Sequence, residues 1–276
     1  MSTYRIYVDS RERVAGSNTD FELSLPFSLA IKEKSLALID VVCVPNSIRT
    51  VTENKNDTIW LKETKSFDEF HIRFCKIEPG YYTVQTLKAA IEVALNTGTF
   101  LYHQYTVGYN ERLARYTFSN PLTVSGESFT LYTAESLKKP VPAGYPEIVG
   151  PDYGAFRQLG LVEGGPVLCN INTGPVTGTG TPNLAANTQL FIKSNLGIPA
   201  TSVGPLGNMS IARRVVLDAP QFALCVDRHT TSWDSIAIAG HTTISTISLA
   251  LCGYDGNPVD LNGQPWSASI SIFREE

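Results

Sequence analysis

The sequence predicts an all-β protein: an antiparallel eight-stranded sandwich with one short amphipathic helix and a long Pro/Gly-rich loop or small insertion. Three observations support this prediction. Large apolar side chains recur at every second position in about a dozen segments of the 276 residues, which is the spacing of half-buried strands. A single segment has helical spacing. Strands and helices do not alternate in the way that builds parallel sheets.

The first part of the chain contains five segments with strand character. They are Tyr4–Val8, Phe21–Leu25, Leu36–Val44, Thr58–Leu61 and Glu69–Cys75. We expect the second segment to stop at Pro26, because proline cannot donate to a β-ladder. The third segment is apolar almost without interruption, so we expect both of its faces to be buried.

The one helix follows a turn made by Pro79, Gly80 and Tyr81. Thr83 is a suitable N-cap, because its hydroxyl can accept a hydrogen bond from the first helical turn. Apolar residues then recur at helical spacing, and Gly98 stands where a helix commonly ends. We expect this helix to lie against a sheet.

Strand character resumes after the helix. Tyr105–Tyr109 and Arg115–Phe118 flank a polar turn and predict a hairpin. Further strands are predicted at Phe129–Tyr132, Thr188–Ser194, Arg213–Leu217, Gln221–Val226 and Ser235–Ile238.

The clearest strand pair lies at the end of the chain. Large and small side chains alternate in Ile247–Leu251 and again in Trp266–Ile272, where the small residues are serines. Two turns separate these strands. Asp255-Gly256 and Asn262-Gly263 supply residues that tolerate positive φ. This region builds a sheet and shows no obvious active site.

The middle of the chain has a different composition. Prolines and glycines are frequent between 138 and 187, and Gly174–Thr181 is close to low complexity. Phe156–Leu161 is a short segment that we expect to be ordered. Long irregular connections are uncommon inside compact domains unless they have a surface role. We therefore expect one domain over 1–276, with 138–187 as a loop insertion within it.

The composition excludes several classes of protein. The net charge is −4 without a basic run, which gives direct nucleic-acid binding little support. No apolar stretch reaches the ~18 residues of a membrane span, and the N-terminus lacks the apolar core of a signal peptide. Five cysteines without paired spacing indicate reduced thiols and synthesis in a cytoplasm. Charged residues are only 17%, which favours a surface that faces other protein.

No segment carries a convincing catalytic or metal-binding motif. Asp227-Arg228-His229 with Ser232 or Asp234 is a conceivable catalytic cluster, but no nucleophile-elbow sequence surrounds a serine. Asp255, Asn257 and Asp260 could be drawn as calcium ligands, although side-chain capping of turns explains them better. We expect no enzyme activity, no metal and no cofactor.

Two groups of residues are candidates for binding. Arg213 and Arg214 could form an interface, since arginine is enriched at protein contacts. Trp60, Trp233 and Trp266 could form an aromatic platform, and Trp233 lies in a polar loop. Such a platform would mark the alternative function, a receptor- or carbohydrate-binding β-sandwich of a spike or minor capsid component.

Five segments, in order along the chain, resemble the single-jelly-roll penton and minor capsid proteins of double-jelly-roll DNA viruses, such as virophages and polinton-like viruses. The resemblance includes the turn residues Pro79, Gly80, Tyr81, Asp255, Gly256, Asn262 and Gly263 together with Trp266. The five segments are Tyr7–Leu25, Val44–Ser47, Pro79–Thr83, Gln189–Asn195 and Asp255–Trp266.

The resemblance implies a single jelly roll in a virion, and it favours the penton. The expected partners are four further copies in a homopentamer at the icosahedral vertex and the surrounding major capsid protein. A fibre or host receptor would be an additional partner. The resemblance carries no catalytic residue over to this chain.

Overall fold

The computed structural model describes residues 4–66, 68–122, 126–138, 154–170, 173–185, 188–197, 204, 207, 210–229, 234–240 and 242–274. The chain forms two compact units. The first comprises Met1–Ile48 and Asn187–Glu276, and the second comprises Arg49–Ala186. This division differs from the expected single domain over 1–276, because each unit makes most of its contacts within itself. The insertion is also longer than 138–187 and begins directly after Ile48.

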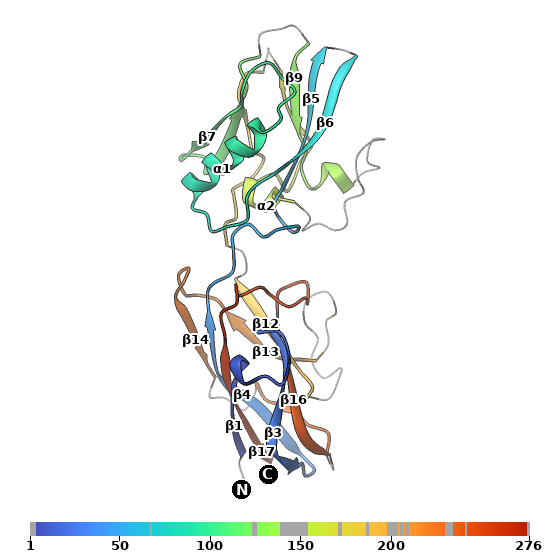
Figure 1. Ribbon diagram of the computed structural model, residues 1–276, viewed down its shortest axis with the longest axis vertical. Helices are drawn as coiled ribbons and strands as arrows, with labels where there is room; N and C mark the ends of the chain where they lie inside the picture. Colours follow the sequence, from blue (N-terminus) through green and yellow to red (C-terminus); the bar gives the residue numbers. More distant parts are fainter. Residues whose placement is uncertain are drawn as a thin grey trace. The chain divides into compact units, whose positions relative to one another are not determined.

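The first unit is a sandwich of two antiparallel sheets (Figure 1). One sheet has the order β1 (Tyr4–Asp9), β17 (Ser267–Arg274), β4 (Ser35–Pro45) and β14 (Leu224–Arg228), with β15 (Ile236–Ala237) also paired to β4. The other has the order β13 (Ile211–Val216), β12 (Gln189–Ser194), β16 (Thr243–Cys252), β3 (Asp20–Ala30) and β2 (Ala15–Gly16). A 3₁₀ turn, η1 (Ser10–Glu12), follows β1.

The strand order of this unit is that of a jelly roll. Without the two-residue strands β2 and β15, the eight longer strands numbered along the chain give the orders 1-8-3-6 and 2-7-4-5. Every strand pair is antiparallel. The predicted eight-stranded antiparallel jelly roll is thus confirmed, and the second unit is inserted in sequence between its third and fourth strands.

The core of the first unit lies between the sheets, where alternate side chains of each strand are buried. Strand β4 departs from the expectation that both faces are buried. Its side chains Val42 and Val44 are fully buried, whereas Val41 and Cys43 are half-buried. The reason is that the outward face of this sheet is not covered by another layer within the described part of the unit.

Strand β3 passes through Pro26 and continues to Ala30, so the expected stop is wrong. Its register with β16 shifts between Ile244 and Thr246, opposite the proline region. A β-bulge relaxes the requirement for a ladder hydrogen bond, and proline is tolerated at such irregular positions.

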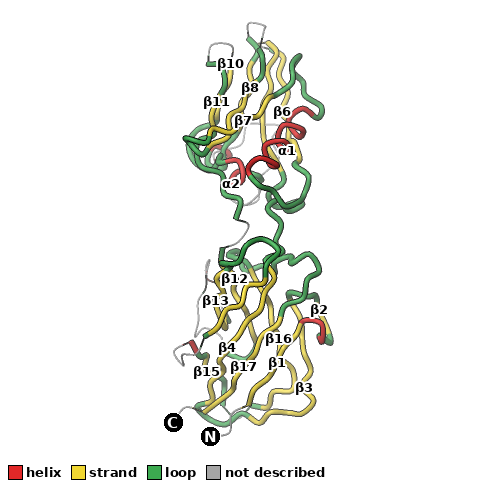
Figure 2. The backbone as a smooth tube through the Cα atoms, turned by 90° about the vertical axis from the view of Figure 1, so that its left-hand side faces the viewer, coloured by secondary structure: helices red, strands yellow, loops and turns green. Residues whose placement is uncertain are grey.

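The second unit combines two smaller antiparallel sheets with two helices (Figure 2). The four-stranded sheet has the order β10 (Val167–Asn170), β9 (Ser128–Leu131), β5 (Thr58–Ser66) and β6 (Glu69–Lys76). The other has the order β11 (Val176–Thr177), β8 (Arg115–Ser119) and β7 (Thr106–Asn110). The helices are α1 (Val84–Asn96) and α2 (Phe156–Leu159), with a 3₁₀ turn η2 (Ser136–Lys138).

Helix α1 forms where the apolar spacing predicts it. Thr83 and Thr86 form a reciprocal capping box at its start, and Gly98 follows its end with a φ of 67°. Leu87, Ile91 and Leu95 are buried in the core of the unit, and the helix lies against β7 (Figure 2). None of the described helices is long and apolar enough to cross a membrane.

Candidate functional site

The turn of Pro79, Gly80 and Tyr81 holds the second unit together. Gly80 exchanges two backbone hydrogen bonds with Val51, at 2.9 and 3.0 Å. A Cβ atom on Gly80 would lie 3.4 Å from the ring of Tyr82, at van der Waals contact. The turn therefore positions the start of α1, and its residues serve structure.

The two C-terminal turns use their own polar side chains. Asp255 accepts hydrogen bonds from the backbone N–H of Asn257 at 3.1 Å and from its side-chain amide at 2.8 Å. Asp260 accepts from the backbone N–H of Asn262 at 2.7 Å. Asn262 and Gly263 both have positive φ, 56° and 75°, as a two-residue type I′ turn requires.

Gly256 and Gly263 also anchor distant segments. The carbonyl of Gly256 accepts a hydrogen bond from Lys193 Nζ at 2.8 Å. The carbonyl of Gly263 accepts one from Asn18 Nδ2 at 2.7 Å. These contacts tie the turns to other parts of the jelly roll, so the turn residues again act in folding.

Trp266 is a core residue and not part of a binding platform. Its side chain is 2% exposed and its ring centroid lies 5.6 Å from that of Phe21. Its backbone N–H donates to Ser10 Oγ at 3.1 Å, and the Ser10 N–H donates back to its carbonyl at 3.0 Å. Trp60 is also buried, so neither tryptophan can form the expected platform. Trp233 lies outside the described residues.

Arg213 and Arg214 occupy different environments. Arg213 is buried, forms an ion pair with Asp227 at 2.9 Å and donates to the carbonyl of Ile39. Its charge is therefore paired inside the first unit, and its interface role stays a prediction. Arg214 is exposed, because it is the next residue along β13 and points to the opposite face.

The residues of the suspected catalytic cluster form a chain of contacts. His229 Nδ1 lies 2.6 Å from Asp234 Oδ2, and its Nε2 lies 3.7 Å from Asp227 Oδ1. Asp227 is in turn paired with Arg213. Both ring nitrogens thus face carboxylates and not a hydroxyl nucleophile, while Ser232 lies outside the described residues. This arrangement joins β14 to the segment before β15.

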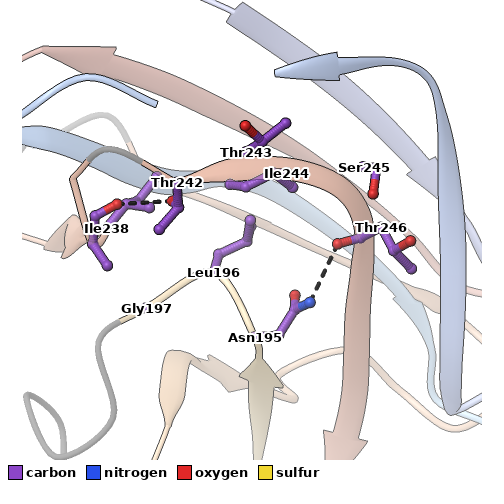
Figure 3. Close-up of a pocket in the computed structure, with 10 residues that line it drawn as sticks. Asn195, Leu196, Gly197, Ile238, Thr242, Thr243, Ile244, Ser245 and Thr246 are labelled. Carbon is purple, nitrogen blue, oxygen red and sulfur yellow. Dashed lines mark hydrogen bonds between the residues drawn. The ribbon is translucent and has the colours of Figure 1, made fainter. Parts of the chain in front are cut away.

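A pocket of about 400 Å³ opens beside the first half of β16 (Figure 3). Asn195 Nδ2 donates to the carbonyl of Thr246 at 3.2 Å, and Thr242 donates to the carbonyl of Ala239 at 2.9 Å (Figure 3). Hydroxyl, amide and backbone groups line it together with Leu196 and Ile238, and none of the ten described lining residues is ionisable. Such a lining suits a neutral polar ligand.

The second unit contains a buried ionic cluster. Glu63 is fully buried and accepts hydrogen bonds from Arg73 at 2.7 Å and from the Tyr105 hydroxyl at 2.7 Å. Burial, reinforced by the Glu63 carboxylate, raises the pKa of Tyr105 far above its usual value. Burial also raises the pKa of Cys75 to about 11. Each side chain of the cluster forms a hydrogen bond with another member, so we interpret the cluster as structural.

Several apolar side chains of the jelly roll are exposed to solvent, and no sequence pattern marks them. Tyr7, Leu224 and Val226 are 75%, 57% and 43% exposed. Their segments are predicted only as half-buried strands, without a statement of which side chains face outward. An outward-facing apolar residue has the same alternation as an inward-facing one, so only their place at the edges of the sheet sets them apart.

The fold and these sites show to which structural class the protein belongs. The chain is a single jelly-roll protein with an inserted second unit, whose conspicuous polar residues stabilise turns and strand packing. No protein-family model matches the chain. No curated protein sequence matches it either.

A comparison with solved structures finds a protein of similar fold. The crystal structure of the mavirus penton protein is similar to this chain over 99% of both chains, with a TM-score of 0.50 and 11% sequence identity. The resemblance found in the sequence is thus confirmed at the level of the fold.

Proposed function

We propose that this chain is a viral capsid structural protein, the penton, which forms homopentamers at the icosahedral vertices and contacts the surrounding major capsid protein. The observation that carries the proposal is the fold likeness to the mavirus penton protein, which extends over 99% of both chains and so includes the inserted unit. The five free cysteines agree with synthesis of the protein in a host cytoplasm.

The proposed mechanism is burial of surface between copies. A closed ring of five requires heterologous contacts, in which one side of a copy meets a different side of its neighbour. A permanent interface of this kind buries about 2,000 Å² or more. The role uses no catalytic residue, cofactor or metal, and it requires neither nucleic acid nor a membrane span. A fibre or host receptor would bind outside the contacts within the ring.

Mass photometry and negative-stain microscopy of the purified full chain test the proposal. The expected particle has about 150 kDa, five times the 30.1 kDa of one chain, and appears as a ring. A strictly monomeric protein at about 100 µM, far above the dissociation constant of a permanent contact, would contradict the pentamer.

The pocket beside β16 favours a second candidate function, recognition of a neutral carbohydrate or receptor group. Its test is a glycan array with the wild type, Trp233→Ala and Ala239→Trp, which places a bulky ring among the lining residues. Binding by the wild type that is lost in Ala239→Trp supports this function. Absence of binding by the wild type contradicts it.

A further inference from the structure

The jelly roll carries exposed apolar side chains at two opposite edges of one sheet. In the order β1-β17-β4-β14, strands β14 and β1 are the two ends, and no other described strand pairs with their outer sides. Open strand edges with apolar side chains are sites of protein association, because their backbone and side chains lack partners within the unit. Each edge is therefore a candidate contact surface.

The β14 edge is defined by Leu224, Val226 and Arg228. Cys225 between them is buried, so these three side chains point away from the core. Val226 lies opposite the half-buried Cys43 on β4, and this pairing extends the apolar surface inward from the edge.

The β1 edge is defined by Tyr7 and by Val14, which lies between η1 and β2. Val8 is buried, so Tyr7 points outward from the same sheet as Leu224 and Val226. Val14 is exposed and is held by a backbone hydrogen bond to Glu22 of β3 at 2.8 Å. A tyrosine of this kind is a common anchor in protein interfaces.

The charges near the two edges are complementary. Arg228 on β14 and Arg214 on β13, an end strand of the other sheet, are exposed cations, and they outnumber the exposed anion Asp218 beside Cys225. Glu12, Asp20 and Glu22 are exposed anions beside β1, and they outnumber Arg13, the exposed cation there that belongs to no ion pair among the described residues. The exposed Arg5 and Arg11 are already paired with Asp40 and Asp9. Arg214, Arg228 and the three anions beside β1 belong to none of the ion pairs found among the described residues. The β14 edge thus carries an excess of positive charge and the β1 edge an excess of negative charge. This favours contact between the two edges over contact between two copies of the same edge.

We propose that the β14 edge of one copy docks on the β1 edge of a second copy, and that this contact repeats around the ring. The inference rests on the proposed function, because a ring needs two different and complementary surfaces on each copy. A two-fold dimer would instead need one self-complementary surface, whereas each edge here carries an excess of one charge.

Two variants test the contribution of each edge to ring assembly separately. Leu224→Asp combined with Val226→Asp places charge in the β14 edge, and Tyr7→Asp does so in the β1 edge. Tyr254→Asp is the matched control, since Tyr254 is exposed in a turn of the same unit. Circular dichroism and thermal unfolding verify that each variant is folded. The milder pair Leu224→Asn and Val226→Thr replaces the double aspartate if that variant does not fold.

The expected result is a ring for the wild type and the control, and a monomer for each edge variant. Mixing the two edge variants restores one intact contact and yields a 1:1 dimer that grows no further. Rings formed by either edge variant alone, or a mixture that stays monomeric, would overturn the assignment. A wild type that is itself monomeric contradicts the proposed function, whereas unaffected rings contradict only these edges.

Cysteine labelling gives an independent readout. Cys43 lies beside Val226 and is the one cysteine that is not fully buried among the five. We expect its alkylation in the ring to be about tenfold slower than in the Tyr7→Asp monomer, because access controls thiol reactivity. Equal alkylation rates in the two forms would contradict burial of the β14 edge.

Discussion

At the scale of single residues, Trp266 connects the two ends of the chain within the jelly roll. Its ring packs on Phe21, and its backbone bonds to Ser10. Removing a large buried side chain loses its burial energy and leaves a cavity.

Trp266→Ala is therefore expected to lower the free energy of unfolding by about 3–5 kcal/mol, and Trp266→Phe by less. Urea denaturation followed by circular dichroism measures both. Tyr254→Ala, at an exposed position, should change stability by less than about 0.5 kcal/mol. Equal small effects of all three substitutions would show that Trp266 is not a core residue.

Because Tyr105 is buried, we expect the free energy of unfolding to depend on pH in the alkaline range. Burial and the Glu63 carboxylate raise its pKa, so the folded unit keeps the phenol neutral while the unfolded chain ionises it near pH 10. The stabilisation linked to Tyr105 is then fully present below pH 10 and is lost as the pH rises above it.

Unfolding of wild type and Tyr105→Phe between pH 8 and about 11 tests this linkage. The variant loses the hydrogen bond to Glu63, so we expect it to be less stable at pH 8. Its stability should decline less steeply above pH 10. Parallel declines of the two proteins would rule out a contribution from Tyr105.

At the scale of elements, α1 depends on its first turn. Thr83 Oγ1 accepts a hydrogen bond from the N–H of Thr86 at 3.2 Å, and Thr86 Oγ1 accepts one from the N–H of Thr83 at 2.9 Å. Thr83→Ala is expected to destabilise the second unit by about 1 kcal/mol. Gln85→Ala, exposed in the same turn, is the control and should be nearly neutral. A Thr83→Ala variant as stable as this control would contradict the cap.

Local chemistry explains which elements could be predicted from the sequence. Asx-Gly turns, the helix cap and long alternating strands depend on neighbouring residues, so Asn262-Gly263, Thr83 and β16 form as expected. The strands β10 and β11 have four and two residues within a Pro/Gly-rich segment. Segments so short lack a clear period, and only pairing with β9 and β8 stabilises them.

The candidate contact surfaces could not be predicted in the same way. Leu224 and Val226 alternate with the buried Cys225, as core residues do with outward-facing ones. Which face of a strand meets the core depends on its partner in the sheet, and that information is not local. The ion pair of Arg213 could not be predicted for the same reason, since its partner Asp227 lies on a separate strand.

At the scale of the whole molecule, the two units define separate cores. The boundary escaped the sequence analysis because the change in composition at 138 lies inside the second unit, whereas no glycine-rich linker marks its start after Ile48. A unit that carries all partners of its buried side chains is expected to fold alone.

Replacing 49–186 by a Gly/Ser linker of about ten residues should therefore leave a folded jelly roll. The isolated 49–186 segment should also fold. Cooperative thermal unfolding and dispersed amide spectra of each piece measure this. A linker variant without a cooperative transition would contradict the independence of the jelly roll, and the same observation on the isolated segment would contradict that of the insert.

The insertion of the second unit between β4 and β12 attaches it by two covalent connections. A protease that cuts one of them leaves the unit linked through the other, so shedding it takes two separate cleavages. Exchange of the unit by recombination likewise requires two crossover points but leaves all eight jelly-roll strands intact. Descendants of such a chain could vary their insert freely while inheriting an unchanged jelly-roll scaffold.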